Sequence, residues 1–273
     1  MKSYPFFIVN AFGAGPLSGN PAGVCILDEW LATDELQCVA QQANLPETAF
    51  LIPTHDQAWA IRWFSVKQEI DLCGHATLAA AHCVFNSEGY RGKRSVRFSS
   101  NSGSLEAKIH ADKMISISLP VAKYRPSSLS TVLVEGLGAY PESVWLGSNY
   151  LCLFDSQHTI ESLQPDFKSL MSLPDGLGVI VTAPSSKSEY DFVSRYFAPR
   201  IGIDEDHATG SAHCMLVPFW AKRLSRSKLD AFQASPRGGR FRGEVLGEKV
   251  RLRGNTEEFL KGTIRFYNKL PGR

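Results

Sequence analysis

Two stretches of the chain combine a glycine with a long apolar run. After Gly74 the residues from Leu78 to Phe85 include almost no polar side chain, and after Gly210 the residues from Cys214 to Trp220 include none. A surface helix shows a polar face, so a helix without one is buried. The pattern predicts two buried helices, each inside a curved sheet.

The two glycine segments form a repeat. Gly74 pairs with Gly210, and upstream a second match pairs residues 62–64 (Arg-Trp-Phe) with residues 195–197 (Arg-Tyr-Phe). Two matched segments in the same order predict a duplicated unit. The start of each helix carries unpaired backbone N–H groups and a partial positive charge, which favour an anion such as a carboxylate. Two helix starts that face one cleft would bind a small acid. Taken singly, each glycine fits equally well a tight turn into a core helix.

Apolar runs with aromatic and β-branched residues predict the surrounding strands. Outside the repeat, a helix is expected with Thr33 as its N-cap, acidic residues in its first turn and an end near Ala43. Weaker helical patterns lie near 130–137 and 159–172, and residues 95–119 are typical of a meander of short strands. Further strands are expected near 4–12, 24–27, 58–66, 177–183, 190–197, 228–234, 240–252 and 262–267.

A proline- and serine-rich stretch from 120 to 130 is typical of a linker. At 273 residues the chain is long enough for two domains, which we place at 1–120 and 121–273, with a last strand able to return to the first domain. Mixed strands around one central helix per half predict an α+β fold with two pseudo-symmetric domains, not a doubly wound parallel sheet.

Composition narrows the class of protein. Apolar content of 44% and charged content of 21% are ordinary for a globular protein. A net charge of +2 argues neither for nor against a polyanionic partner. Without an apolar run of membrane-spanning length or an N-terminal signal, the cytoplasm is the expected location and no membrane partner is expected. The six cysteines form no CxxC pair, so we expect reduced thiols that mostly fill the core.

Several cofactor sites are absent from the sequence. His75 and His82 would lie two helical turns apart, roughly 10 Å along the axis, which is too far for one shared metal. The glycines near residue 13 lack the spacing of a dinucleotide fingerprint, and no phosphate-binding P-loop is present. We therefore expect neither a metal nor a nucleotide cofactor.

A function of another class, RNA binding, is suggested by residues 237–243, Arg-Gly-Gly-Arg-Phe-Arg-Gly, which are similar to a short RGG box. The same residues fit an ordinary hairpin with a Gly-Gly turn, and Glu244 and Glu248 dilute the charge. The hairpin is the better interpretation, and we do not expect a nucleic-acid partner.

Four segments together resemble the signature segments of the PhzF-like phenazine-biosynthesis family. They occur in the family's order and extend over most of the chain. In this sequence they are residues 19–24 (GNPAGV), 44–50 (NLPETAF), 71–77 (DLCGHAT) and 206–214 (DHATGSAHC).

This resemblance implies a diaminopimelate epimerase-like fold, with the active site between two domains, and a homodimer. Isomerases of the family move a proton on a small carboxylic acid without a metal or organic cofactor, as in trans-2,3-dihydro-3-hydroxyanthranilate isomerase. The family's acid/base glutamate falls on Glu47, although a lone glutamate at a strand start is usually solvated. A carboxyl group in apolar surroundings can both donate and accept a proton near neutrality. The supporting catalytic positions are His75, Asp206 and Ser211, and the substrate-binding positions are Asn20, Gly74 and Gly210.

Three positions depart from the family pattern. Pro46 stands before the glutamate where serine is expected, His207 follows the aspartate where proline is expected, and Asn10 replaces a usual aspartate in the first strand. All three belong to segments near the implied pocket, so the substrate need not be the phenazine precursor.

The epimerase relatives suggest a second reaction, in which two thiols flank a substrate α-carbon. Cys73 occupies one thiol position, and His207 occupies the other. A two-cysteine racemase is therefore incomplete, although a mixed Cys73/His207 pair stays open. A free cysteine commonly behaves as a small buried hydrophobe, so packing is the more ordinary role for Cys73.

Overall fold

The computed structural model describes residues 2–54 and 58–266 and contains two compact units. Unit 1 comprises Met1–Leu17, Pro21–Ile117 and Asn255–Arg273, and unit 2 comprises Ser18–Asn20 and Ser118–Gly254. Three of the four boundaries between the units, at 20/21, 117/118 and 254/255, fall inside strands.

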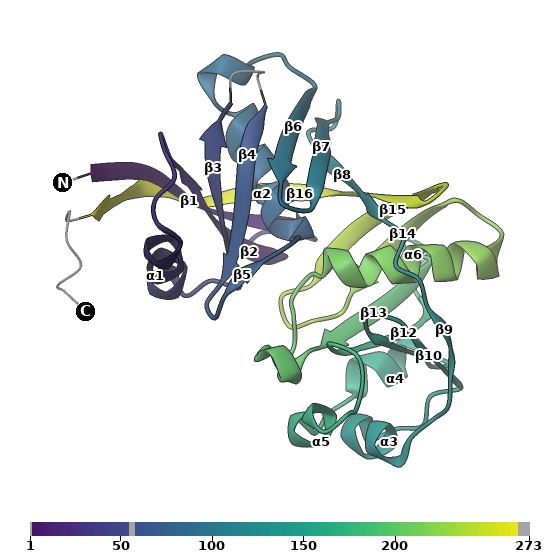
Figure 1. The fold of residues 1–273 in the computed structure, drawn as a ribbon. Helices are drawn as coiled ribbons and strands as arrows, with labels where there is room; N and C mark the ends of the chain where they lie inside the picture. Colours follow the sequence, from purple (N-terminus) through teal and green to yellow (C-terminus); the bar gives the residue numbers. More distant parts are fainter. Residues whose placement is uncertain (1, 55–57, 267–273) are drawn as a thin grey trace. The chain divides into compact units, whose positions relative to one another are not determined.

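Unit 1 is a mixed sheet with two α-helices (Figure 1). Its strands follow the order β1-β2-β3-β4-β6-β7-β8, with β5 paired to β4. Its elements are β1 (Lys2–Gly13), β2 (Asn20–Ile26), α1 (Thr33–Ala43), β3 (Glu47–Pro53), β4 (Trp59–Ser65), β5 (Glu69–Ile70), α2 (Gly74–Phe85), the short 3-10 helix Glu88–Tyr90, β6 (Ser95–Ser100), β7 (Gly103–Ile109) and β8 (Ile115–Pro120).

Helix α2 is the apolar centre of unit 1. Ten of its twelve residues are buried, and it packs against β1, β3, β6 and β7. Its four alanines allow the strands to approach closely, because a methyl group adds little width to the helix. Helix α1 packs on the other face of the sheet, where Leu36, Val39 and Ala40 meet Phe50 and Phe64. The prediction of a buried helix after Gly74 is confirmed.

The strands of unit 2 belong to the same mixed sheet and follow the order β15-β14-β13-β12-β11-β10-β9. Its elements are β9 (Arg125–Ser127), α3 (Thr131–Leu137), β10 (Ser143–Leu146), β11 (Tyr150–Leu153), α4 (Gln157–Ser162), α5 (Phe167–Met171), β12 (Val179–Pro184), β13 (Phe192–Phe197), the 3-10 helix Pro199–Ile201, α6 (Gly210–Leu224), β14 (Lys228–Gln233), β15 (Gly239–Leu246) and β16 (Lys249–Phe266), which continues into unit 1.

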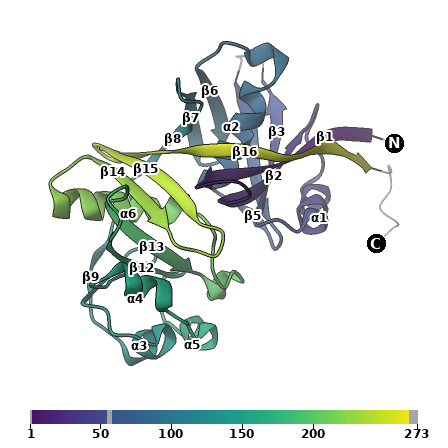
Figure 2. The ribbon, with the colours of Figure 1, turned by 180° about the vertical axis from the view of Figure 1, so that it is seen from behind.

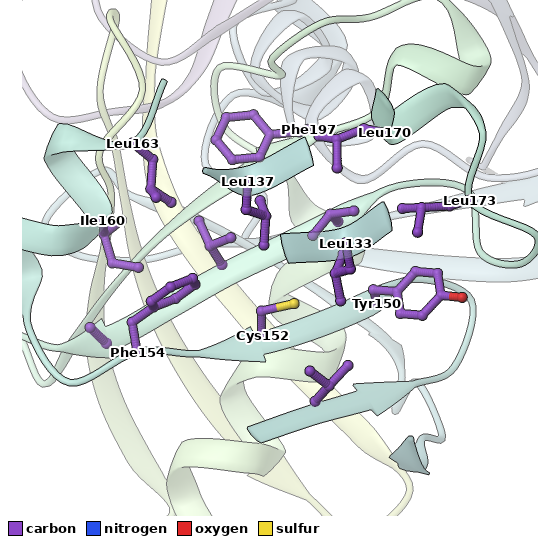
Figure 3. Packing of buried hydrophobic residues seen from close by; sticks show 14 of the residues in the cluster. Leu133, Leu137, Tyr150, Cys152, Phe154, Ile160, Leu163, Leu170, Leu173 and Phe197 are labelled. Carbon is purple, nitrogen blue, oxygen red and sulfur yellow. The ribbon is translucent and has the colours of Figure 1, made fainter. Parts of the chain in front are cut away.

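The sheet of unit 2 has helices on both faces. Val179 and Val181 of β12 pack with α3, α4 and α5 in the core that Figure 3 shows. Thr182, one residue further on, points to the opposite face and accepts a hydrogen bond from Trp220 of α6, with the indole nitrogen 3.0 Å from its hydroxyl. Successive strand residues point to opposite faces, so a strand covered on both sides must be apolar throughout. Nine residues of α6 are buried, as predicted for the helix after Gly210.

The two units repeat the same sequence of strand pairings. From β2 to β8 the pairs are parallel, antiparallel, parallel, antiparallel and antiparallel. From β11 to β16 the same five kinds of pair follow in the same order. An α+β fold built from mixed sheets is therefore present, while the evolutionary duplication stays a prediction.

The aligned arginines make the same contacts in each unit. Arg62 binds Glu69 through two hydrogen bonds of 2.7 and 2.6 Å and stacks on the ring of Phe64, 5.1 Å from its centre. Arg195 binds Glu205 through bonds of 2.7 and 2.9 Å and stacks on Phe197, 4.9 Å from its centre. Each pair joins a strand to the segment that connects that strand with the buried helix. Bidentate, partly buried geometry makes these pairs stronger than ordinary surface ion pairs.

Some boundaries differ from the prediction. Thr33 is the first residue of α1 rather than its cap, because Glu35 reaches back to the backbone N–H of Ala32 at 3.0 Å. The helical pattern at 159–172 is divided into α4 and α5. The strands expected at 240–252 and 262–267 are instead β15, a turn, and the single long strand β16, which lies along β1 in Figure 2. Short strands β5, β9, β10 and β11 were not predicted.

The arginine-rich segment is a strand of the sheet, not an RGG box. Its arginines are engaged by the protein: Arg237 donates to the carbonyl of Gly19 at 2.8 Å, and Arg240 and Arg242 lie 3.7 and 3.1 Å from Asp230. Gly239 is required sterically, because a Cβ there would lie 2.6 Å from the Cβ of Ala208. The segment therefore has a structural role beside the loop before α6.

Two further expectations can be compared with the structure. Five of the six cysteines are buried and all are free, as predicted, and the exposed one is Cys38. Among the described residues, no helix combines the length and the apolar character needed to cross a bilayer.

The buried His213 on α6 predicts a loss of stability in acid. Its Nδ1 donates to the carbonyl of Thr209 at 2.8 Å, and its ring stacks on Phe241 with centroids 3.6 Å apart. Burial lowers the pKa of His213 to about 4. The unfolded chain therefore binds this proton at a higher pH than the folded chain does. We expect the titration of His213 to lower the free energy of unfolding by up to about 3 kcal/mol as the pH falls from 6.5 to about 4.

The matched variant is His213→Asn, which can keep the bond to Thr209 but cannot titrate. Urea unfolding should show a smaller stability difference between neutral pH and pH near 4 in this variant than in the parent. Equal differences in both proteins would contradict the assignment, whatever the absolute stability of the variant.

Candidate functional site

Glu47 is the first residue of β3, and the alternation of the strand sets its direction. Phe50 and Ile52 belong to the cluster that packs with α1. Residues of odd number in β3 therefore face the opposite side, toward α2, and Glu47 faces this side. Its side chain is only 13% exposed. The solvated strand-end carboxylate that a lone glutamate would suggest is not what the structure shows.

Three polar side chains meet at the start of α2. His75 Nε2 lies 3.1 Å from Glu47 Oε2, and His75 Nδ1 lies 3.6 Å from the sulfur of Cys73. Cys73 is the N-cap residue of α2, in an extended conformation with φ −134° and ψ 114°. The imidazole therefore contacts the carboxylate through one nitrogen and the thiol through the other.

The charges of this cluster favour a protonated histidine. Burial lowers the pKa of His75, but attraction to the neighbouring Cys73 and Glu47 raises it by more, so this pKa lies well above the ordinary value of 6.5. Burial raises the pKa of the Cys73 thiol. The Cys73 sulfur and the Glu47 carboxylate, which contact opposite nitrogens of the ring, are the groups that favour its charged form. His75 then forms an ion pair with Glu47 through Nε2 and contacts the Cys73 sulfur through Nδ1.

In unit 2, Asp206 is buried at the centre of a hydrogen-bond network before α6. Its Oδ1 accepts from Asn20 Nδ2 at 2.7 Å and from the backbone N–H of His207 at 3.0 Å, and its Oδ2 accepts from the hydroxyl of Thr209. Asn20 also donates to the carbonyl of Ala208 at 3.1 Å. Asp206 and Asn20 thus hold the loop that leads into the helix.

Gln233 of β14 completes the network from the sheet. Its side-chain oxygen accepts from the backbone N–H of Thr209 at 2.8 Å, and its nitrogen donates to the carbonyl of Asp206 at 2.7 Å. Gln233 and Thr209 were not predicted as site residues. A polar residue on the buried face of an alternating strand, after Leu229 and Ala231, is the signal that could have indicated Gln233. The sequence does not show which backbone groups it would meet.

The first turn of α6 presents Gly210 and Ser211. Gly210 is buried, whereas Ser211 is exposed, and its hydroxyl forms no hydrogen bond within residues 2–54 and 58–266. In the same described ranges, the backbone N–H groups of these two residues have no acceptor, as expected for the first residues of a helix. The start of α6 can therefore donate hydrogen bonds to an anion.

The predicted residues fall into two groups, one in each unit. In unit 1, Glu47 and His75 are in contact and Gly74 is the first residue of α2, between His75 and the capping Cys73. In unit 2, Asn20 and Asp206 are in contact, and the predicted Gly210 and Ser211 follow at the start of α6.

The departures from the family pattern also have defined places. His207 is half-buried, and its carbonyl accepts from the hydroxyl of Ser235 at 2.6 Å. Pro46 directly precedes Glu47, and Asn10 is buried within β1.

The network predicts that Gln233→Ala is strongly destabilising. The substitution leaves the buried N–H of Thr209 and the carbonyl of Asp206 without their partner, and each unsatisfied group costs about 1–3 kcal/mol. We expect the free energy of unfolding in urea to fall by about 2–4 kcal/mol. The control is Gln41→Ala on the exposed side of α1, which should change stability by less than about 0.5 kcal/mol. Similar effects of the two substitutions would contradict the role given to Gln233.

Comparison with known proteins places the chain in a family. Residues 9–262 match the model of the family described as phenazine biosynthesis-like protein. A Pseudomonas aeruginosa protein named an uncharacterized isomerase is 45% identical, over 95% of this chain and 98% of its own length. A crystal structure of a PhzF-family phenazine biosynthesis protein from Enterococcus faecalis is 38% identical, with a TM-score of 0.92 over 97% of this chain and all of that one.

A more distant structure shares the fold alone. The hydroxyproline epimerase of Agrobacterium vitis has a TM-score of 0.62 at 9% identity, over 96% of this chain and 92% of its own. The family resemblance seen in the four sequence segments is confirmed by a match over nearly the whole chain. The protein is thus an isomerase-type enzyme that belongs to the phenazine biosynthesis-like (PhzF) family.

Proposed function

We propose that the protein is a cofactor-independent isomerase that moves a proton on a small carboxylic acid, with Glu47 as the acid/base residue. The observation that carries the proposal is the contact of Glu47 with His75 at 3.1 Å, with both side chains largely shielded from water. A general base needs a fixed direction and limited hydration, and this pair supplies both.

His75 acts through Glu47 in this proposal. As an imidazolium it stabilises the carboxylate that accepts a proton from a carbon of the substrate. When Glu47 is protonated, it returns the proton to another carbon of the same conjugated acid. One carboxyl group that first accepts and then donates is sufficient for an isomerisation, because no proton is gained or lost overall.

The helix starts supply the electrostatic part of the reaction. We assign the backbone N–H groups at Gly74 and Gly210, with the hydroxyl of Ser211, to binding of the substrate carboxylate and of charge that develops during proton transfer. Asp206 accepts and Asn20 donates hydrogen bonds that hold the loop before α6. Their assigned role is to hold that loop in the binding conformation. The duplication of the unit and the use of both helix starts by one substrate stay predictions.

The Cys73 racemase is the weaker alternative. Proton abstraction by a thiol requires its thiolate, and burial raises the pKa of Cys73. The partner position carries His207 rather than a second cysteine. These two features favour Glu47 as the group that moves the proton.

Glu47→Gln tests the acid/base role of Glu47. The probe is trans-2,3-dihydro-3-hydroxyanthranilate or a related acid in deuterated water, and mass spectrometry measures deuterium in the carbon skeleton. The amide is nearly isosteric and can still form hydrogen bonds, so folding and binding should persist. We expect exchange to fall by about 10²–10⁴-fold, the usual contribution of a positioned acid/base group.

Cys73→Ser separates the two mechanisms, because it removes thiolate chemistry while it changes the volume little. The Glu47 mechanism predicts that this variant keeps most of its exchange. The reverse pattern, with Cys73→Ser inactive and Glu47→Gln active, would establish the racemase. If both variants exchange like the parent, neither group is the base.

Proline substitutions test carboxylate binding at the two helix starts. Cys73 and Thr209 have extended ψ angles of 114° and 103°, which suit a following proline, so Gly74→Pro and Gly210→Pro remove one N–H without opposing the helix. The dissociation constant of a small dicarboxylate, measured by calorimetry, should rise by about 10- to 100-fold. The matched controls are the two alanine variants, which keep the N–H. Proline variants that bind like their alanine controls would refute carboxylate binding at these positions.

A further inference from the structure

Cys73, His75 and Glu47 together form a set of ligands that the isomerase reaction does not fully use. One ligand atom from each residue, the sulfur, a ring nitrogen and a carboxylate oxygen, lies within 4.8 Å of the other two. The spacing argument from sequence considered His75 with His82, which are two turns apart. The fold instead brings Glu47 of β3 close to Cys73 and His75 at the start of α2.

The separation of the His75 and Cys73 ligand atoms matches that of a zinc site, and a Glu47 oxygen lies within 4.8 Å of the other two ligand atoms. Zinc binds sulfur at about 2.3 Å and nitrogen or oxygen at about 2.0–2.2 Å, so tetrahedral ligands are about 3.3–3.6 Å apart. The observed separations are 3.1 Å between His75 and Glu47 and 3.6 Å between His75 and Cys73. These two contacts use opposite nitrogens of the ring. A single ion therefore requires the carboxylate of Glu47, which is the most exposed of the three groups, to turn toward the sulfur.

The position of Cys73 also suits a metal thiolate. As the N-cap of α2 its sulfur lies at the positive end of the helix, where a negative charge is stabilised. Sulfur, imidazole and carboxylate together select a borderline-soft cation such as Zn²⁺ over Mg²⁺ or Ca²⁺, which prefer oxygen ligands alone. Three protein ligands leave the fourth position of a tetrahedral ion open to water.

We propose that Glu47, Cys73 and His75 form an inhibitory binding site for a thiophilic divalent cation of the Zn²⁺ type. Binding replaces protons on the sulfur and on the imidazole, which pass to the solvent, and forms bonds from the ion to sulfur, nitrogen and oxygen. While the ion is bound, the oxygen of Glu47 is a ligand and cannot accept a proton from carbon. The binding site itself rests on the geometry alone, and only the inhibition rests on the proposed function.

The direct test is calorimetric titration of the full-length protein with ZnCl₂, together with the absorption spectrum after addition of Co²⁺. We expect one equivalent of Zn²⁺ and a thiolate-to-cobalt charge-transfer band. Cys73→Ser should abolish that band and weaken Zn²⁺ binding by more than about 100-fold, beyond the 10–100-fold typical for loss of an outer-shell partner. Glu47→Gln should weaken Zn²⁺ binding while the band persists. The matched control is Cys38→Ser, which removes the exposed cysteine and should change neither result.

Several outcomes would overturn the site. They are an absence of Zn²⁺ binding in the parent, a Co²⁺ spectrum without the thiolate band, or a band that Cys38→Ser removes and Cys73→Ser does not. If Cys73→Ser does not fold, the Co²⁺ spectrum of the parent and the Zn²⁺ affinity of Glu47→Gln still test the site. An unchanged Zn²⁺ affinity in Glu47→Gln contradicts the three-ligand site. A separate measurement of deuterium exchange with added Zn²⁺ tests the inhibition. Binding without inhibition would refute the role of Glu47 in the reaction but not the metal site.

Discussion

Each unit of this protein depends on the burial of a helix that has no polar face. Such a helix can be covered only by strands on several sides, and its first N–H groups must be placed where an acceptor can reach them. In unit 1 the solution is α2, which packs against four strands and begins directly after the extended residue Cys73. In unit 2 it is α6, whose start is fixed by Asp206, Thr209 and Gln233. The candidate residues of each unit lie at or near the start of its own buried helix.

The same constraint explains the electrostatics of Glu47 and His75. The strands that cover α2 bring Glu47 to the second residue of the helix, where water is largely excluded. A buried carboxylate without a partner would be costly, and the imidazolium of His75 offsets that cost. The ion pair therefore allows the carboxylate to be buried and, in the proposed reaction, holds it in place for proton transfer. The bidentate pairs of Arg62 and Arg195 hold the two loops that lead into the helices.

Much of this arrangement could be predicted from the sequence, because it is encoded in local patterns. The apolar runs after Gly74 and Gly210 specify buried helices, and the family segments point to Glu47, His75, Asp206 and Ser211. The contacts of Gln233 could not be predicted, since they join a strand to a loop 24 residues away in sequence. Short strands such as β10 and β11 escaped prediction because four residues are too few to show a periodicity. The convergence of Cys73 and Glu47 on one imidazole likewise depends on tertiary packing.

The central claim is that His75 is an imidazolium and forms an ion pair with the carboxylate of Glu47. The most direct measurement is the ¹⁵N NMR titration of the His75 ring in the parent and in Glu47→Gln. The account predicts that the ring of the parent remains protonated at both nitrogens through neutral pH, since its pKa is raised well above 6.5, and that loss of the carboxylate lowers this pKa. A neutral His75 in the parent at pH 7, or the same titration in both proteins, would contradict the account.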